Sequence, residues 1–163
     1  MTVINGLPAH VLFVHAIVIL APLTAVLEII CALWAGARRG QLVWVTLVLA
    51  VITTVLTPIT IQAGNWLYDL RRSPDAVLQE HAELGDTMIY FSVALLVVAL
   101  ALVALRYAER RDDTRRVLYN AIVAVVAILV GVASIVQVYR IGDAGAQSVW
   151  SKEIAHLTSA NQR

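Results

Sequence analysis

The stretch that decides the fold class is residues 88–105, MIYFSVALLVVALALVAL, which contains no charged side chain. A helix rises about 1.5 Å per residue, so roughly 20 apolar residues cross the hydrocarbon core of a bilayer. With this stretch as the third, the sequence predicts four spans, at residues 11–37, 42–61, 86–105 and 117–139. Each is expected to be helical, because backbone groups in lipid need hydrogen-bond partners within their own segment.

The composition agrees with a membrane protein and excludes several other classes. Hydrophobic residues make up 60% of the 163-residue chain and charged residues only 14%, whereas a soluble domain carries about a quarter. The net charge of +1 comes without a dominant basic stripe, which argues against a nucleic-acid partner. The lone Cys31 provides neither an intramolecular disulfide nor a cysteine zinc motif. No nucleophile constellation or phosphate loop assigns the chain to an enzyme class.

Arginine is distributed unevenly among the predicted connections. The first and third connections are short and hold two and five arginines, while the second holds only Arg71 and Arg72. Because basic loops stay on the cytoplasmic side of a membrane, we expect both termini to face outward. The short connections predict two antiparallel hairpins, and hence an all-α bundle of four transmembrane helices over residues 1–140.

The last segment, residues 141–163, is predicted to be a polar tail on the outer side. Residues 142–148 are rich in Gly and polar residues, which predicts a loop. In residues 149–157, Trp150, Ile154 and Leu157 share one helical face, which predicts a short interfacial helix.

Each span carries a stripe of small and polar residues at helical spacing. Such stripes mark helix–helix contacts in a membrane, because lipid is as apolar as a large hydrophobic side chain and its burial gains no hydrophobic free energy. The clearest stripe belongs to the second span and comprises Thr46, Ala50, Thr53, Thr57, Thr60 and Gly64. We expect these stripes to face the centre of the bundle.

Three histidines are expected to share one layer at the outer end of the bundle, namely His10, His15 and His81. His10 and His81 fall on the inward stripes, whereas His15 lies about 140° around the helix from His10. Imidazole and carboxylate form the ligand set of many transition-metal sites, and two histidines from different helices can hold a haem b. The cofactor alternatives are therefore haem on two of these histidines, a metal on all three with Asp69, or none, with histidines that bind only water and lipid head groups.

Glu28 is a separate signal because it falls inside the first span. An ionisable group there is costly and is usually paired or functional. One interpretation is a neutral acid bonded to Thr24 or to a threonine of the second span. The other is a proton or ion station.

The arrangement of the histidines is similar to that of a known family. A lead rich in Gly, Leu and Pro ends at His10, and His15, Gly64, Asp69 and His81 follow. Over about residues 6–140 this pattern resembles an uncharacterised family of bacterial four-helix predicted membrane proteins. The chain departs from the family pattern at Val11, Ala16 and Ile17. The resemblance implies a multi-pass protein of the bacterial plasma membrane, in which the three histidines and Asp69 belong together, but it brings no activity.

Three functions remain open from the sequence. The first is electron transfer or metal handling, with haem b or a transition metal held by His15 and His81, with His10 as their neighbour, and with Asp69 orienting an imidazole. The second is a non-catalytic accessory or assembly subunit of a membrane complex. The third is a proton-coupled carrier that uses Glu28 and acts as a homo-oligomer.

Overall fold

The protein folds into one small hairpin followed by helices. The computed structural model describes residues 3–4, 6–70, 75–108 and 116–160. The hairpin pairs β1 (Val3–Ile4) with β2 (Leu7–Pro8), and Gly6 lies between them at φ 81°. The helices are α1 (Ala9–Leu33), α2 (Ala35–Arg39), α3 (Leu42–Asp69), α4 (Ala76–Ala108) and α5 (Arg116–Ala160).

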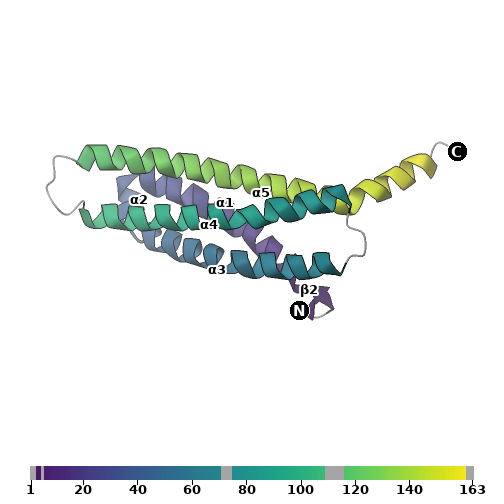
Figure 1. Cartoon of the computed structure of the whole chain (residues 1–163). Helices are drawn as coiled ribbons and strands as arrows, with labels where there is room; N and C mark the ends of the chain where they lie inside the picture. Colours follow the sequence, from purple (N-terminus) through teal and green to yellow (C-terminus); the bar gives the residue numbers. More distant parts are fainter. Residues whose placement is uncertain (1–2, 5, 71–74, 109–115, 161–163) are drawn as a thin grey trace.

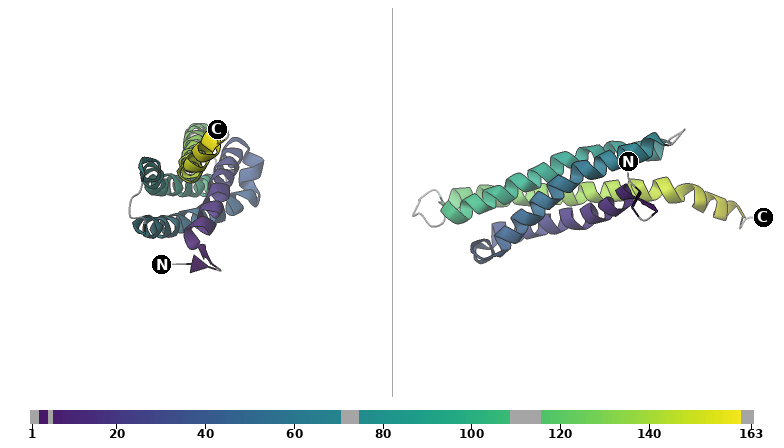
Figure 2. Two further views of the ribbon diagram at one scale, coloured as in Figure 1. Left: turned by 90° about the vertical axis from the view of Figure 1, so that its right-hand side faces the viewer. Right: turned by 90° about the horizontal axis from the view of Figure 1, so that it is seen from below.

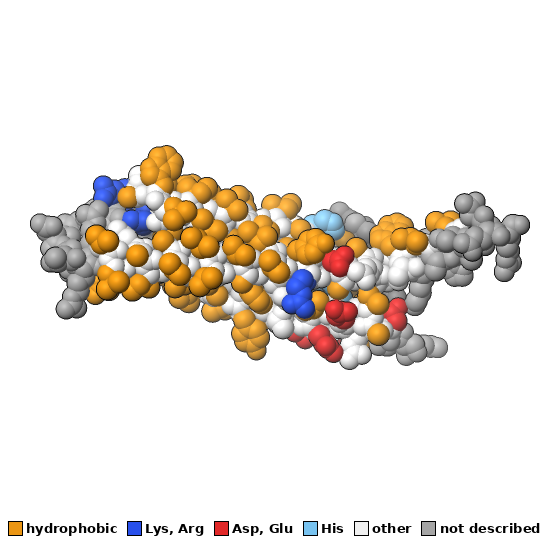
Figure 3. All heavy atoms as spheres, turned by 90° about the horizontal axis from the view of Figure 1, so that it is seen from above, with side chains coloured by type: hydrophobic (Ala, Val, Ile, Leu, Met, Phe, Trp, Pro, Cys, Tyr) orange, Lys and Arg blue, Asp and Glu red, His pale blue; other side chains and the backbone are white. Residues whose placement is uncertain are grey.

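The four long helices form the predicted antiparallel bundle (Figures 1 and 2). Each is packed against two neighbours, so that the order around the bundle is α1, α3, α4, α5. All four are long and apolar enough to cross a membrane. Hydrophobic side chains cover the middle of the face in Figure 3, and acidic side chains gather toward one end. The prediction of a multi-pass, four-helix membrane protein is confirmed.

The centre of the bundle is built from the small and polar stripes, as expected. Four threonines of α3 are buried there: Thr46, Thr53, Thr57 and Thr60. Each donates its hydroxyl hydrogen to the carbonyl four residues earlier in its own helix, at 2.7–2.8 Å. Because these hydroxyls are satisfied within α3, the threonines provide close packing with little demand on neighbouring helices.

The two ends of the bundle differ in the polar residues that they hold. At the end we call the arginine end, Arg38 reaches back from α2 and donates from Nη1 to the carbonyls of Cys31 (2.7 Å) and Ala32 (3.1 Å). These bonds satisfy carbonyls that the end of α1 leaves without helical donors. Arg106 donates to the carbonyls of Arg38 and Gly40. The opposite end, which we call the histidine end, holds His10 and His81.

The helices are longer at the histidine end than the apolar pattern predicted. Helix α1 begins at Ala9, and α3 continues to Asp69, past the predicted limit at residue 61. At the arginine end, α1 stops at Leu33 because Trp34 is extended, with φ −117° and ψ 104°. Hydropathy locates the lipid-facing part of a helix, and not the polar turns that extend it.

The predicted loop at residues 142–148 is wrong, because α5 is continuous from Arg116 to Ala160. Tertiary packing outweighs the low helix propensity of the glycines there. Ala144 is buried, and Gly145 lies against α4. The Gln147 side chain donates to Asp143 at 2.9 Å, one turn earlier in the same helix. The tail therefore extends the fourth helix (Figure 1).

Candidate functional site

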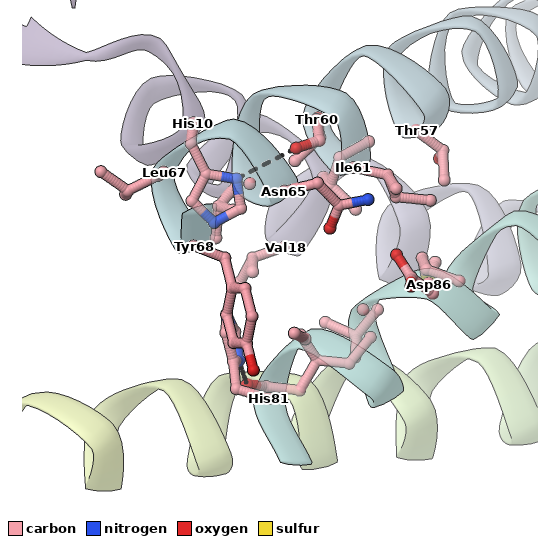
Figure 4. Close-up of a pocket in the computed structure, with 18 of the residues that line it drawn as sticks. His10, Val18, Thr57, Thr60, Ile61, Asn65, Leu67, Tyr68, His81 and Asp86 are labelled. Atoms are coloured by element: carbon pink, nitrogen blue, oxygen red, sulfur yellow. Dashed lines mark hydrogen bonds between the residues drawn. The ribbon is translucent and has the colours of Figure 1, made fainter. Parts of the chain in front are cut away.

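A pocket opens at the histidine end between α1, α3, α4 and α5. It encloses about 870 Å³ of space between atoms, a figure that includes the open solvent at its mouth. Its lining is mostly apolar and includes Val14, Val18, Ile61, Leu67, Leu78 and Val138. His10 and His81 contribute imidazoles to this lining from α1 and α4, and Figure 4 shows them on opposite walls.

His10 is held on one wall by α3. Its Nδ1 lies 3.0 Å from the carbonyl oxygen of Thr60, so Nδ1 carries a hydrogen and donates it. The ring lies directly on the backbone of Gly64, one turn further along α3. A Cβ atom at Gly64 would lie 2.8 Å from Cε1 of the imidazole, closer than real Cβ contacts come. Glycine at position 64 is therefore required for this ring position.

His81 is held in the same way by α5. Its Nδ1 lies 2.9 Å from the carbonyl oxygen of Ile141 and donates a hydrogen to it. Its ring lies on the backbone of Gly145, where a Cβ atom would be 2.9 Å from Cε1. Each histidine thus has a carbonyl that orients the ring and a glycine that lets the ring approach a neighbouring helix.

The two imidazoles face each other across the pocket. Their ring centroids are 6.4 Å apart and their planes meet at 80°. With Nδ1–H donated to a carbonyl, the neutral ring keeps its lone pair on Nε2. In Figure 4 the second nitrogen of His10 points toward the side where His81 lies. The pair therefore offers two imidazole lone pairs in one apolar pocket.

The structure separates the other two predicted members from this pair. His15 is exposed, and its Nδ1 lies 2.6 Å from the carbonyl of Val11 in its own helix. Asp69 is exposed at the last residue of α3 and does not line the pocket. Backbone carbonyls, and not Asp69, orient the imidazoles. We expected His15 and His81 as ligands and left open whether His10 is the better one; of His10 and His15, only His10 lines the pocket.

A metal site made by the protein alone is not apparent. Among the residues that the structure describes, no group of three or more His, Cys, Asp or Glu side chains could hold a metal ion. The predicted cluster of His10, His15, His81 and Asp69 is therefore not assembled as one ligand set. What the fold does assemble is a two-histidine site.

Sequence reasoning missed Asn65 and Tyr68, which line the pocket together with the histidines and Asp86. Tyr68 lies four residues after Gly64, about one helical turn, which was the available signal. Asn65 is adjacent to Gly64, and that spacing gave no signal. Gly145 was missed because its segment was expected to be a loop.

Glu28 lies elsewhere, deep in the bundle. It is completely buried, and neither carboxyl oxygen has a hydrogen-bond partner within the described residues. The expected bond to Thr24 is absent, because that hydroxyl donates to the carbonyl of Leu20 at 2.7 Å. Glu28 is only five residues, about 7.5 Å along the axis, from the end of α1 at Leu33. It therefore lies nearer the arginine end than the pocket.

The fold and the site together define a class: a multi-pass, four-helix membrane protein with a paired-histidine pocket at one end of the bundle. The chain belongs to the family described as "Predicted membrane protein (DUF2231)", whose model matches residues 6–158. The resemblance seen in the sequence is thereby confirmed at the level of the family, which is described by its membrane location and not by an activity. No curated protein and no solved structure matches the chain.

Proposed function

We propose that this protein binds one haem b between His10 and His81 and transfers electrons at the histidine end of the bundle. The observation that carries the proposal is the geometry of the imidazole pair. In this proposal the histidine end faces outward from a bacterial plasma membrane, which the excess of arginine in the connections at the other end supports.

The spacing of the rings is compatible with two histidine ligands of one metal. A ring nitrogen binds a transition metal at about 2.0–2.1 Å, and the ring centre lies about 1.2 Å beyond the nitrogen. Two imidazoles whose nitrogens both point at one metal would therefore have centres about 6.4–6.6 Å apart. The observed centroid distance between His10 and His81 is 6.4 Å. This spacing fits a shared metal centre.

The orientation of each ring supports ligation further. A metal-binding histidine usually donates its other ring N–H to a carbonyl or carboxylate, which fixes the tautomer and raises ligand basicity. The carbonyls of Thr60 and Ile141 accept these hydrogens at 3.0 and 2.9 Å. The Nε2 atom of each ring therefore carries a lone pair that could bind a metal.

Haem fits this ligand count better than a bare ion does. A zinc or copper ion bound by protein needs three or four side-chain ligands, and no such group is found in the described part of the chain. Haem iron needs two from the protein, because the porphyrin supplies four nitrogens. The pocket between the two histidines is lined mainly by apolar side chains. Its apolar walls suit a macrocycle.

Two histidine ligands would favour electron transfer. If His10 and His81 both held the haem, no coordination position would remain for oxygen or another substrate. Haem would supply a one-electron couple there, and the apolar wall and the histidine orientation would tune its potential. The residues of this chain would hold the ring, exclude water and expose one edge through the open mouth.

The test is an optical spectrum of detergent-purified protein made with ample haem, before and after reduction, with parallel metal analysis. We expect one haem per chain with the sharp reduced bands of a six-coordinate centre. His10→Ala and His81→Ala should each abolish them, while the matched control His15→Ala should keep them. Absence of haem, even after reconstitution, or equal loss in all three variants, would overturn the proposal and favour an accessory-subunit role.

A further inference from the structure

We propose that Glu28 is a second site, independent of haem binding: a proton-exchange group inside the bundle that takes up and releases its proton toward the arginine end. The proposal rests on the burial of this carboxyl, on the absence of partners for it, and on the residues that separate it from that end.

The burial of Glu28 indicates that its resting form is the neutral acid. An isolated carboxylate in an apolar interior is very costly, so a buried acid without a partner keeps its proton. The side chain is 0% exposed, and neither oxygen has a hydrogen-bond partner within the described residues. An acid retained only for packing is expected to be hydrogen-bonded. Glu28 departs from that pattern, so packing alone does not account for it.

The position of Glu28 in the core is equally unusual. Two clusters of buried apolar residues lie along the bundle, one ending at Ala25 on α1 and the other beginning at Cys31. Glu28 lies between them, three residues from each. The carboxyl therefore lies within the apolar core, between the two clusters. It is not part of a polar contact that reaches in from the surface.

Some polar groups lie between this level and the arginine end. The sulfur of Cys31, one turn from Glu28, lies 3.8 Å from the hydroxyl of Thr46. Arg38 is 2% exposed and donates to the carbonyl of Cys31 at 2.7 Å and to Oδ1 of Asn120 at 3.4 Å. Asn120 lies near the start of α5, at the arginine end.

Few titratable groups share the interior with Glu28. Among the buried residues in the described part of the chain, Glu28, Cys31 and Arg38 are the titratable ones, while α3, α4 and α5 contribute threonine, serine, glutamine and apolar residues. In the proposed exchange the Glu28 O–H bond breaks, its proton passes to a water molecule, and the carboxylate remains until a proton returns.

Infrared spectroscopy of the protein in lipid films tests this directly. We expect a carbonyl stretch of a protonated carboxylic acid that shifts when H₂O is replaced by D₂O, and that is lost in Glu28→Gln. The matched control, Glu80→Gln, changes an exposed carboxyl and should leave the band unchanged. A missing band, or a band that stays unshifted as long as the most protected amides, overturns the proposal.

Two further measurements keep the test decisive if Glu28→Gln does not fold. Glu28→Asp should retain the acid band at a shifted frequency. In the unmodified protein in liposomes, a hydrophobic carbodiimide should label Glu28, as mapped by mass spectrometry, with labelling that falls as pH rises. Labelling confined to exposed carboxyls would refute a protonated, exchanging Glu28. None of these readouts depends on haem, so failure here is distinguishable from failure of the haem proposal.

Discussion

The most informative perturbation adds one methyl group behind either histidine. In Gly64→Ala the new Cβ would lie 2.8 Å from Cε1 and 2.9 Å from Nδ1 of His10, and in Gly145→Ala it would lie 2.9 and 3.1 Å from the same atoms of His81. Ordinary van der Waals contact begins at 3.4 Å, so each ring must move by about half an ångström. That movement lengthens its Nδ1–H bond to a carbonyl and shifts Nε2.

The expected magnitude follows from overpacking. Inserting a methyl group into a tight contact costs about 1–3 kcal/mol, which corresponds to a loss of roughly 5- to 150-fold in haem affinity, since about 1.4 kcal/mol is tenfold. Haem titration of the apoprotein in detergent, followed at the Soret band, measures this loss. The double variant should lose more than either single variant.

The matched control is Gly142→Ala, the same substitution in the same helix as Gly145. A Cβ at Gly142 meets nothing within 4 Å, so haem affinity should not change. Helix stability should rise by up to about 1 kcal/mol, because alanine is the better helix former. If Gly64→Ala and Gly145→Ala bind haem as tightly as this control, the glycines do not position the ligands and the reasoning fails.

Three further predictions concern stability, each measured by thermal unfolding in detergent. Arg38→Gln should destabilise the bundle by about 2–3 kcal/mol, because charge-assisted bonds to buried carbonyls are lost. The exposed control Arg39→Gln should change stability little, and equal effects of the two variants would contradict a capping role for Arg38. Gln137→Leu should cost about 1–2 kcal/mol, since its amide joins α5 to the Thr87 hydroxyl at 2.7 Å on α4, and a neutral result would refute that link. Thr53→Val should stay within about 1 kcal/mol, because its hydroxyl bonds only within α3; a larger loss would reveal an interhelical role.

Much of the fold was readable from hydropathy and small-residue spacing. A lipid-exposed helix must be apolar over its whole lipid-facing length, so the four spans stand out from composition alone. The threonine stripe of α3 faces inward for a similarly local reason, the 3.6-residue period. Hydropathy carries no information on polar helical turns beyond the lipid, so the continuity of α5 through Gly142 and Gly145 was not predicted.

The candidate site, too, was only partly predictable from the sequence. Helical spacing alone was enough to set His10 and His81 on inward faces of their helices and to mark Glu28 as exceptional. The position of the His10 ring depends on the carbonyl of Thr60, and that of the His81 ring depends on Gly145 and Ile141. These residues are 50 to 64 positions away in the chain. Local sequence determines which way a side chain points on its own helix, whereas only the packing of helices against one another decides what it meets there.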